Sequence, residues 1–565
     1  MEKLYKISLY AVKFLTLLLA VLLFAGSFLT TCYADNMETQ QVLFRLDNPL
    51  WNLLELAGFG LLFCACLHFY DKFGRKFRRG LLIFTLGFIF CLGVLLILFG
   101  RTVPAADAMS VYNAALEWIQ GNLDVIHPTV SYLSYYPQQV GLMAFLELFL
   151  RIWNLTGISA PAWHFIKLIY VCLLCAAVLF QYLSLKYLWR EHWEEISCCY
   201  LLLVCCNLPM IMYSSFVYGE IPSFAALSVG LYLLLRLLSG ITFPDHIHTG
   251  SHEGISLKSS DSETVSCAVP SPELHSTWST FFTGTGSILF LALSVMLRKN
   301  SLIPIIAVLL VLLFESLRFG RSVRARLCLL GMAVCLAVTS VGILPLVQKC
   351  YEKKAGNTLS SGVTAMSYFA MGMQEASRGC GWYNGFNIDT YDAAGMDSAL
   401  ANEISRQAVL ERLAYFRGHP GYAVDFYARK HLSQWADGTY ASRQATLAAY
   451  GGRSGFFQEV YDGSLSSAYI EWGNAWQDVL YLGTLVFCVS AVHRKRKNTA
   501  TAPQGSDTDS LYLSLYLYVG LIAVLGGFLF HILWEANSRY IFLYSLLMMP
   551  YCAAGIYTVF AEYAK

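Results

Sequence analysis

Charged residues are scarce in this sequence. Only 13% of its 565 residues are Asp, Glu, Lys or Arg, whereas a typical soluble domain has about 25%. Such a low fraction, beside 56% hydrophobic residues, excludes an ordinary soluble protein. The net charge is only +2, so the chain also lacks the basic excess that binds a nucleic-acid backbone, and nucleic acid is not an expected partner.

A disulfide framework is missing as well. Most of the 17 cysteines lie in apolar runs, as Cys64, Cys66 and Cys198 do, and there a thiol behaves as a small hydrophobic side chain. Cys350 and Cys380 fall instead in a segment that we expect outside the membrane, where an oxidising environment permits pairing. Whether they pair stays open, because a disulfide requires a geometry that spacing along the chain does not give.

What the sequence does contain is a series of long apolar runs. A helix that crosses a bilayer needs about 20 mostly apolar residues. Runs near this length lie at about 8–30, 50–70, 80–99, 163–186, 196–213, 222–238, 279–296, 301–317, 327–347, 476–492, 511–533 and 541–560. The fold predicted from them is all-α, a polytopic transmembrane helix bundle with about 12 spans. The first run exceeds the apolar core of a signal peptide, which is about 7–15 residues, so we interpret it as an uncleaved anchor.

The basic loops predict the orientation in the cell membrane. Lys and Arg collect in the loops 72–79, 186–190, 318–326 and 494–497. All four loops fall on the cytoplasmic side, as the positive-inside rule requires, if both termini of this multi-pass chain are cytoplasmic. The run 138–153 carries Glu147 and Arg151, and counting it as a span would break this agreement. We therefore predict a helix that lies in the outer interface.

These spans divide the chain into five parts. They are N-terminal transmembrane helices at 1–99, an outer catalytic loop with interfacial helices at 100–153, a central transmembrane bundle at 163–347, a small external helical domain at 348–475, and C-terminal transmembrane helices at 476–565. Two polar segments, 239–277 and 494–509, are predicted to be cytoplasmic and disordered. His246, His248 and His252 in the first of them are spaced for a metal, but such loops are also commonly just solvated.

The first outer loop carries the leading candidate for chemistry. Asp107 precedes the pattern Met109, Tyr112, Ala115, Leu116 and Ile119, which predicts an amphipathic helix on the membrane surface. The carboxylate of Asp107 is either a catalytic base or the N-cap of that helix. Further along the loop, the rings of Tyr132, Tyr135 and Tyr136 are suited either to stacking on a sugar or to an aromatic belt at the interface.

Three more short segments place polar residues at outer helix ends. Tyr218 and Glu220 lie in the sequence YGEIP, Arg298 and Lys299 lie between two spans, and Glu535 and Arg539 lie just before the last span. Each has a structural alternative: Glu220 complements a helix dipole, and Arg298 and Lys299 anchor helix ends. An arginine on the outer side runs against the charge rule, so Arg539 calls for a functional reason.

In their order and common side, these segments resemble the C-type (GT-C) integral-membrane glycosyltransferases, which include protein O-mannosyltransferases and lipid A aminoarabinose transferases. The resemblance implies a single displacement with inversion, in which an acceptor hydroxyl attacks the anomeric carbon of a polyprenyl-phosphate sugar and the phosphate leaves. It implies Asp107 and Glu220 as catalytic bases, Arg298, Lys299 and Arg539 as ligands of the donor phosphate, and Tyr135, Tyr136, Tyr218 and Glu535 as substrate-binding residues.

The resemblance also bounds the cofactors and partners. Many relatives have a second acid after the loop aspartate, where this chain has Ala108, so a divalent metal is not supported and no cofactor is expected. The expected partners are a polyprenyl-phosphate-linked sugar donor, membrane lipid, and an acceptor that is a lipid, a wall polymer or a protein. The sugar transferred, a hexose or a pentose, stays open.

Two other functions compete with this interpretation. A transporter or flippase of lipid-linked sugars usually has ionisable residues at mid-membrane and inverted repeats, whereas the predicted spans are nearly free of internal charge and the sequence shows no internal repeat. A glycan polymerase or ligase that uses a diphosphate carrier would retain the transfer chemistry, and the sequence does not separate it from the first interpretation.

Overall fold

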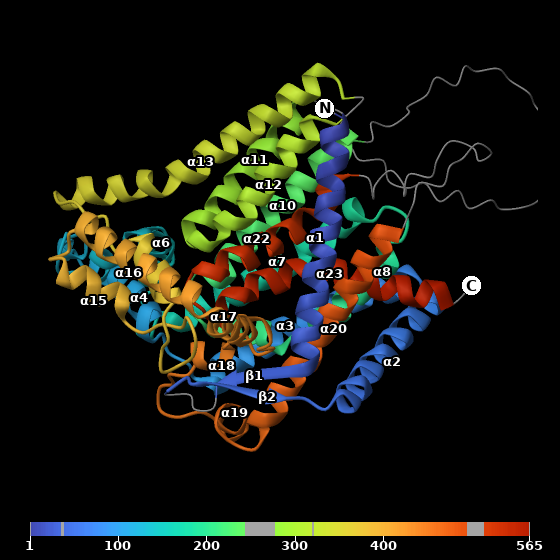
Figure 1. The fold of residues 1–565 in the computed structure, drawn as a ribbon, viewed down its shortest axis with the longest axis horizontal. Helices are drawn as coiled ribbons and strands as arrows, with labels where there is room; N and C mark the ends of the chain where they lie inside the picture. Colours follow the sequence, from blue (N-terminus) through green and yellow to red (C-terminus); the bar gives the residue numbers. More distant parts are fainter. Residues whose placement is uncertain (1, 35–38, 243–276, 319–320, 494–513, 564–565) are drawn as a thin grey trace, which may run out of the picture.

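The protein is a bundle of long helices with one small β-hairpin (Figure 1). The computed structural model describes residues 2–34, 39–242, 277–318, 321–493 and 514–563. Within them, eleven helices are long and apolar enough to cross a membrane, or twelve if one bent pair is a single span. The predicted fold class is therefore confirmed, and each of the twelve predicted runs corresponds to one of these helices.

The membrane-spanning candidates and the outer elements alternate along the chain. The spans are α1 (Glu2–Leu29), α2 (Pro49–Phe73), α3 (Arg75–Leu95, continued by a π-turn to Gly100), α7 (Trp163–Leu188), α8 (Trp193–Cys206) with α9 (Leu208–Met212), α10 (Glu220–Thr242), α11 (Thr277–Leu297), α12 (Leu302–Ser316), α13 (Val323–Ala355), α20 (Leu465–His493), α22 (Val519–Leu533) and α23 (Ser538–Tyr563). The other elements are β1 (Thr30–Ala34), β2 (Val42–Leu46), α4 (Ala106–Ile119), α5 (Tyr132–Tyr135), α6 (Val140–Leu155), α14 (Ala365–Gly372), α15 (Phe386–Ala393), α16 (Ser398–Gly418), α17 (Pro420–Trp435), α18 (Ser442–Ala445) and α19 (Gly455–Tyr461).

The interior and the lipid-facing surface both consist of apolar side chains. Large buried aromatic residues such as Trp476, Tyr481 and Tyr544 fill the centre, where α20 packs along α23. Large apolar side chains on α1, α2, α3 and α13 stay exposed, for example Phe14 and Val338. A soluble protein would bury such continuous apolar faces, so they indicate contact with lipid tails.

The bent span places one of the predicted site segments. α8 and α9 belong to the predicted run 196–213, but their axes differ by 63°. The chain breaks because Asn207 caps α9 by accepting a hydrogen bond from the backbone N–H of Met210, and Pro209 in the first turn cannot donate to α8. After the bend the chain continues into the turn that contains Tyr218, and α10 begins directly after this turn.

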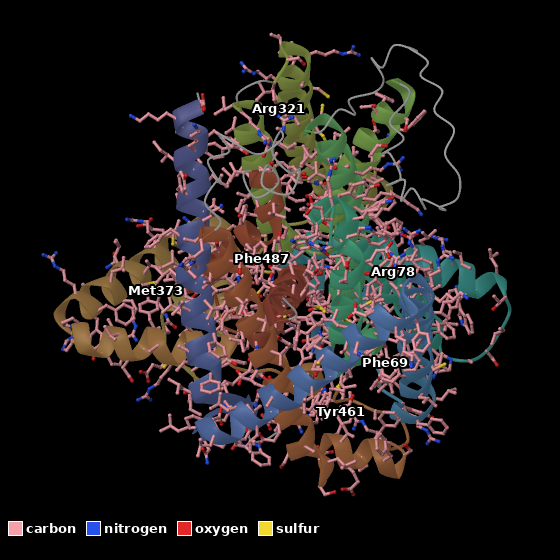
Figure 2. All side chains as sticks on the ribbon, turned by 90° about the vertical axis from the view of Figure 1, so that its right-hand side faces the viewer. Phe69, Arg78, Arg321, Met373, Tyr461 and Phe487 are labelled. Atoms are coloured by element: carbon pink, nitrogen blue, oxygen red, sulfur yellow. The ribbon has the colours of Figure 1, made fainter. Side chains whose placement is uncertain are left out.

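The extramembrane segments gather at one end of the bundle. Figure 1 shows α4, α6, α15 and α16 together beside the C-terminal end of α13. Arg321, in a predicted cytoplasmic loop, and Tyr461, in the predicted external piece, lie at opposite ends of the molecule (Figure 2). The helix α6 is not among the candidate spans, in agreement with the interfacial helix predicted at 138–153.

Several boundaries differ from those expected from hydropathy. α13 continues to Ala355 and α20 already begins at Leu465. Good helix formers such as Glu352 and Lys353 prolong α13 until Gly356 ends it in the left-handed conformation. The first turns of α20 are stabilised by tertiary contacts instead, since the buried Tyr469 and Asn474 form hydrogen bonds with Ser442 and with the backbone of Gly438. α10 reaches Thr242, so the start of the segment 239–277 is helical. The remainder of this segment, with its three histidines, and the segment 494–509 lie outside the described residues. The described part contains no cluster of metal-ligating side chains, and Cys350 and Cys380 are free thiols in it.

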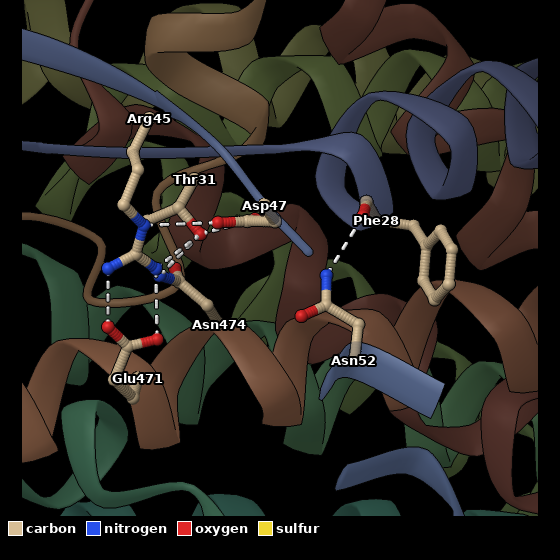
Figure 3. A network of polar contacts seen from close by, with 7 residues as sticks. All are labelled: Phe28, Thr31, Arg45, Asp47, Asn52, Glu471 and Asn474. Carbon is tan, nitrogen blue, oxygen red and sulfur yellow. Dashed lines mark hydrogen bonds and ion pairs between the residues drawn. The ribbon is translucent and has the colours of Figure 1, made fainter. Parts of the chain in front are cut away.

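The hairpin of β1 and β2 was not predicted, and it ties the first helix to the outer surface. Its antiparallel strands pair Thr31 with Arg45. Figure 3 shows how Arg45 bridges Glu471, through Nη1–Oε1 and Nη2–Oε2 distances of 2.5 and 2.9 Å, and Asp47, through an Nε–Oδ1 distance of 3.1 Å. Asn474 donates to the hydroxyl of Thr31 over 3.1 Å. The hairpin is thereby fixed to α20.

Candidate functional site

A large cavity lies at the end of the bundle where the elements between the spans gather. Its volume is about 1180 Å³, somewhat larger than typical ligand pockets of about 300–1000 Å³. It is lined by the N-terminal end of α4, the turn before α10, the start of α12, the segments 363–388 and 433–445, and the segment 530–540. Eight of the nine predicted site residues line it: Asp107, Tyr135, Tyr136, Tyr218, Arg298, Lys299, Glu535 and Arg539.

Asp107 is exposed to this cavity from the first turn of α4. The helix begins at Ala106, the capping position is Ala105, and no side chain caps the helix, so the alternative role of Asp107 as an N-cap is wrong. No ion pair or hydrogen bond joins its carboxylate to another described residue. The loop before it is held by Lys167, whose Nζ donates to the hydroxyl of Thr102 over 2.8 Å. The carboxylate is therefore free to meet a ligand.

Glu220 lies behind the cavity and holds two arginines that line it. Its buried carboxylate forms an ion pair with Arg298, and its Oε1 is 3.7 Å from Nε of Arg539. The two guanidinium groups come from different parts of the chain, the turn before α12 and the start of α23. Because Glu220 itself does not line the cavity, this geometry does not support its predicted role as a base and instead suits the positioning of the two arginines.

The turn before α10 requires a glycine for this arrangement. A Cβ atom on Gly219 would lie 2.6 Å from the carbonyl oxygen of Leu297, far closer than any tolerated contact. The absence of a side chain thus lets the backbone beside Glu220 approach the backbone beside Arg298. The ion pair follows from this close contact between two turns.

Arg539 and Lys299 differ in their surroundings. The guanidinium of Arg539 lies 5.6–5.7 Å from the ring centroids of Phe216, Tyr218 and Tyr540, and rings at this distance attract a cation. Asn537 accepts a hydrogen bond from the N–H of Arg539 and so begins α23. Lys299 is exposed, and no ion pair connects it with a described residue. The site therefore combines a cation that is packed among aromatic rings with an exposed one.

Glu535 is buried at the edge of the cavity, with 6% of its surface exposed. The hydroxyl of Tyr540 donates to its Oε2 over 3.2 Å. Burial raises the pKa of Glu535 to about 7, although Arg539 and the Tyr540 hydrogen bond oppose the shift. Its loop is fixed by the bond from Ala536 N–H to the carbonyl of Gly381, 2.7 Å long. The carboxyl is thus held in a fixed position and largely removed from water.

The predicted tyrosines connect the first outer loop with other outer elements. The hydroxyl of Tyr135 donates to Asp392 in α15 over 2.7 Å, and Gln139 donates to the hydroxyl of Tyr218. Burial raises the pKa of Tyr136 and of Tyr218. All three tyrosines therefore stay neutral hydrogen-bonding groups beside the cavity.

The outer helical piece supplies residues that the sequence analysis missed. Arg378, Trp382, Tyr383 and Asn387 line the cavity. The backbone of Arg378 is held because its carbonyl accepts a hydrogen bond from Val42 at the start of β2, 2.9 Å long. No ion pair links the Arg378 side chain to the rest of the described chain. The dense run RGCGWYN at 378–384 was the one available signal, since glycines beside aromatic and cationic residues are typical of binding loops.

Asp437 fixes the loop after α17 against the start of α23. Its Oδ1 accepts from Thr439 N–H over 2.9 Å, and its Oδ2 accepts from the hydroxyl of Ser538 over 2.6 Å. Burial raises its pKa, while these hydrogen bonds act in the opposite direction. Ser538 precedes Arg539, so this network helps to set the position of the guanidinium.

No protein family model matches the chain, and no curated protein does. Among solved structures, the archaeal oligosaccharyltransferase AglB from Archaeoglobus fulgidus, in complex with an inhibitory peptide and a dolichol-phosphate, is similar with a TM-score of 0.44 and 13% identity, over 87% of this chain and 51% of that one. The Archaeoglobus fulgidus oligosaccharyltransferase tethered to an acceptor peptide gives a TM-score of 0.43 at 14% identity, over 87% and 50%. Its apo form gives 0.42 at 13% identity, over 87% and 51%. The chain thus spans about half the length of these structures.

Proposed function

We propose that this protein is a membrane glycosyltransferase of the GT-C type, which transfers a sugar from a polyprenyl-phosphate donor to an acceptor hydroxyl at the outer membrane face. One observation carries the proposal: two guanidinium groups, Arg298 and Arg539, line the same outer cavity as the unpaired carboxylate of Asp107. A cation pair for the phosphate and a carboxylate that accepts a hydrogen bond from the attacking hydroxyl are what this displacement needs.

The arginines suit the donor phosphate. Arg298 and Arg539 share the single negative charge of Glu220, so one net positive charge remains beside the cavity, and Lys299 adds another. Planar guanidinium groups bind phosphate oxygens bidentately. Because the leaving phosphate gains negative charge as the bond to the sugar breaks, fixed cations stabilise the transition state more than the ground state.

The membrane side of the cavity suits the lipid part of the donor. It is lined by Leu302, Ile303 and Ile306 of α12 and by Phe530 of α22. From Ile306, the exposed side chains of Leu310 and Leu313 continue along one face of α12, at the spacing of successive helical turns. A polyprenyl chain lying on this face would place its phosphate at the arginines.

Asp107 suits the acceptor. It accepts a hydrogen bond from the attacking hydroxyl and so orients the oxygen and increases its electron density. The hydroxyl then loses its proton to an acceptor group in the cavity as its oxygen forms a bond to the anomeric carbon, the bond from that carbon to the phosphate oxygen breaks, and the electron pair stays on the phosphate. Attack opposite the phosphate inverts the anomeric configuration.

The test is transfer by the purified protein. We expect that the protein in lipid nanodiscs, mixed with solubilised membrane acceptors, moves radiolabel from one member of a panel of polyprenyl-phosphate hexoses and pentoses to a product without the carrier. Polyprenyl phosphate should appear in equal amount. Label that crosses a proteoliposome membrane with the phosphate bond intact would indicate a flippase instead, and transfer only from diphosphate donors would indicate a polymerase or ligase.

A further inference from the structure

The cavity contains a second carboxyl that the displacement described above does not use. Glu535 faces the same space as Asp107, from the loop between α22 and α23. It forms no ion pair within the described chain, and the hydroxyl of Tyr540 is its hydrogen-bond donor there. A buried carboxyl with one neutral donor and access to the cavity differs from a carboxylate fixed in a salt bridge, because it can bind and release a proton.

Charged and titratable groups from several helices and loops surround Glu535 and determine the pKa of its carboxyl. They are Arg539 and Tyr540 on α23, Asp107 on α4, Arg378 before α15, Lys430 on α17, and the tyrosines Tyr136, Tyr368 and Tyr383. Burial has the largest effect and raises the pKa of Glu535, and the negative charge of Asp107 raises it further, whereas Arg539, Arg378 and the Tyr540 hydrogen bond lower it. The balance leaves the pKa at about 7.

Glu535 could either donate a proton to the leaving phosphate or accept one from the attacking hydroxyl. The leaving phosphate is a weak base and already faces two guanidinium groups, so it gains little from a proton. The attacking hydroxyl must lose its proton, and a carboxylate with a pKa near the working pH is a stronger acceptor than an ordinary glutamate, whose pKa is about 4.3. Acceptance is therefore the more effective use of Glu535.

We propose, on the basis of the proposed function, that Glu535 is a catalytic residue that takes the proton of the acceptor hydroxyl, while Asp107 orients that hydroxyl. The hydroxyl O–H bond breaks, and its proton goes to the carboxylate of Glu535. The oxygen bonds to the anomeric carbon, and the electron pair of the broken carbon–oxygen bond goes to the phosphate. Glu535 returns the proton to solvent when the products leave.

The pH profile of transfer tests this role, because its sign separates a base from an acid. A base must be deprotonated, so wild-type kcat/KM should be constant above the pKa and fall as pH decreases through about 7. Glu535→Gln should lower the rate by about 10²–10⁴-fold and remove this acidic limb. Tyr540→Phe should retain activity and move the limb to higher pH, because it removes a hydrogen bond that lowers the pKa. Asp425→Asn, an exposed carboxylate on α17 that does not line the cavity, is the matched control and should change nothing.

Two results would overturn the role of Glu535 alone. One is an acidic limb that persists in Glu535→Gln with near wild-type turnover, and the other is a wild-type rate that falls as pH increases through 7. The failure of the wild type to transfer sugar from any polyprenyl-phosphate donor is a different outcome, which refutes the proposed function and the role of Glu535 with it.

Discussion

The guanidinium of Arg539 lies 3.7 Å from the carboxylate of Glu220, although the two residues begin helices that are far apart in the sequence. Arg298 contacts the same carboxylate from a third segment. This shared anion lets two cations lie side by side at the wall of the cavity, where their mutual repulsion would otherwise separate them.

Removal of that anion should weaken both the fold and donor binding. Glu220→Gln leaves two largely buried cations without their counter-ion, and the loss of one partner of a buried pair costs about 3 kcal/mol or more. We expect a lower unfolding temperature in detergent and a higher KM for the donor. The double variant Glu220→Gln with Arg298→Gln should recover part of the stability, since it removes one unpaired cation. A Glu220→Gln protein of normal stability that has lost only kcat would instead restore the base role.

A lysine at position 539 tests whether transfer depends on the positive charge alone or also on the planar guanidinium group. Arg539→Lys retains the positive charge but loses the planar group that binds two phosphate oxygens and lies among three rings. Transfer should fall about tenfold or more, the equivalent of one charge-assisted hydrogen bond of about 1.5–3 kcal/mol, while the yield of folded protein is retained. Arg429→Lys on the exposed face of α17 is the control. Equal turnover in wild type, Arg539→Lys and Arg539→Ala would remove this residue from the site.

The role of Asp107 can be measured without a confounding loss of stability. Because its side chain caps no helix, Asp107→Asn and Asp107→Ala should both unfold at nearly the wild-type temperature. Asp107→Asn should nevertheless lose at least about 10² in rate, the lower part of the range for acid–base catalysis. In the residual activity the acidic limb should remain, since Glu535 is still present, but it should move to lower pH, because the variant removes a negative charge that raises the pKa of Glu535. Wild-type turnover in Asp107→Asn would exclude any contact with the reacting hydroxyl.

Cysteine labelling in intact cells tests the orientation. Asp462 follows α19 at one end of the molecule, and Arg324 opens α13 at the other, and both are exposed. In a background without native cysteines, we expect Asp462→Cys to react with an impermeant reagent from outside and Arg324→Cys to react only after permeabilisation, as the charge rule requires. The reverse pattern would invert the whole topology and place the cavity in the cytoplasm.

Hydropathy was sufficient for the spans because each lipid-exposed helix needs its own continuous apolar run, and the run is visible without any knowledge of its neighbours. It was insufficient for the helix ends, since α13 continues beyond its apolar run, where propensity and capping determine its length, and the first turns of α20 pack against the loop at 438–442, which is separate in the sequence. The hairpin was missed because its strands are short and are stabilised by Glu471 and Asn474, far away in the sequence.

In the candidate site, too, some residues were predictable from the sequence, whereas others depend on contacts between distant segments. Arg539 was identifiable because a cation on the outer side is unusual for a membrane protein. Arg378 and Tyr383 were not, because only the folding of the outer piece over the cavity places them there. For Glu220 the sequence indicated an acid at a helix start, but the two arginines that occupy its carboxylate become apparent only in three dimensions.

The cavity wall is assembled from turns that leave the ribosome one after another, and the segment with Glu535 and Arg539 follows all the others. A nascent chain whose earlier helices are already inserted would therefore present Glu220 with only one of its two cations and Asp107 without the opposite carboxyl. Such an intermediate lacks the groups that would bind a lipid-linked sugar. The chain should consequently gain the ability to bind the lipid-linked sugar in one step late in biosynthesis. Partly synthesised chains would not bind the donor.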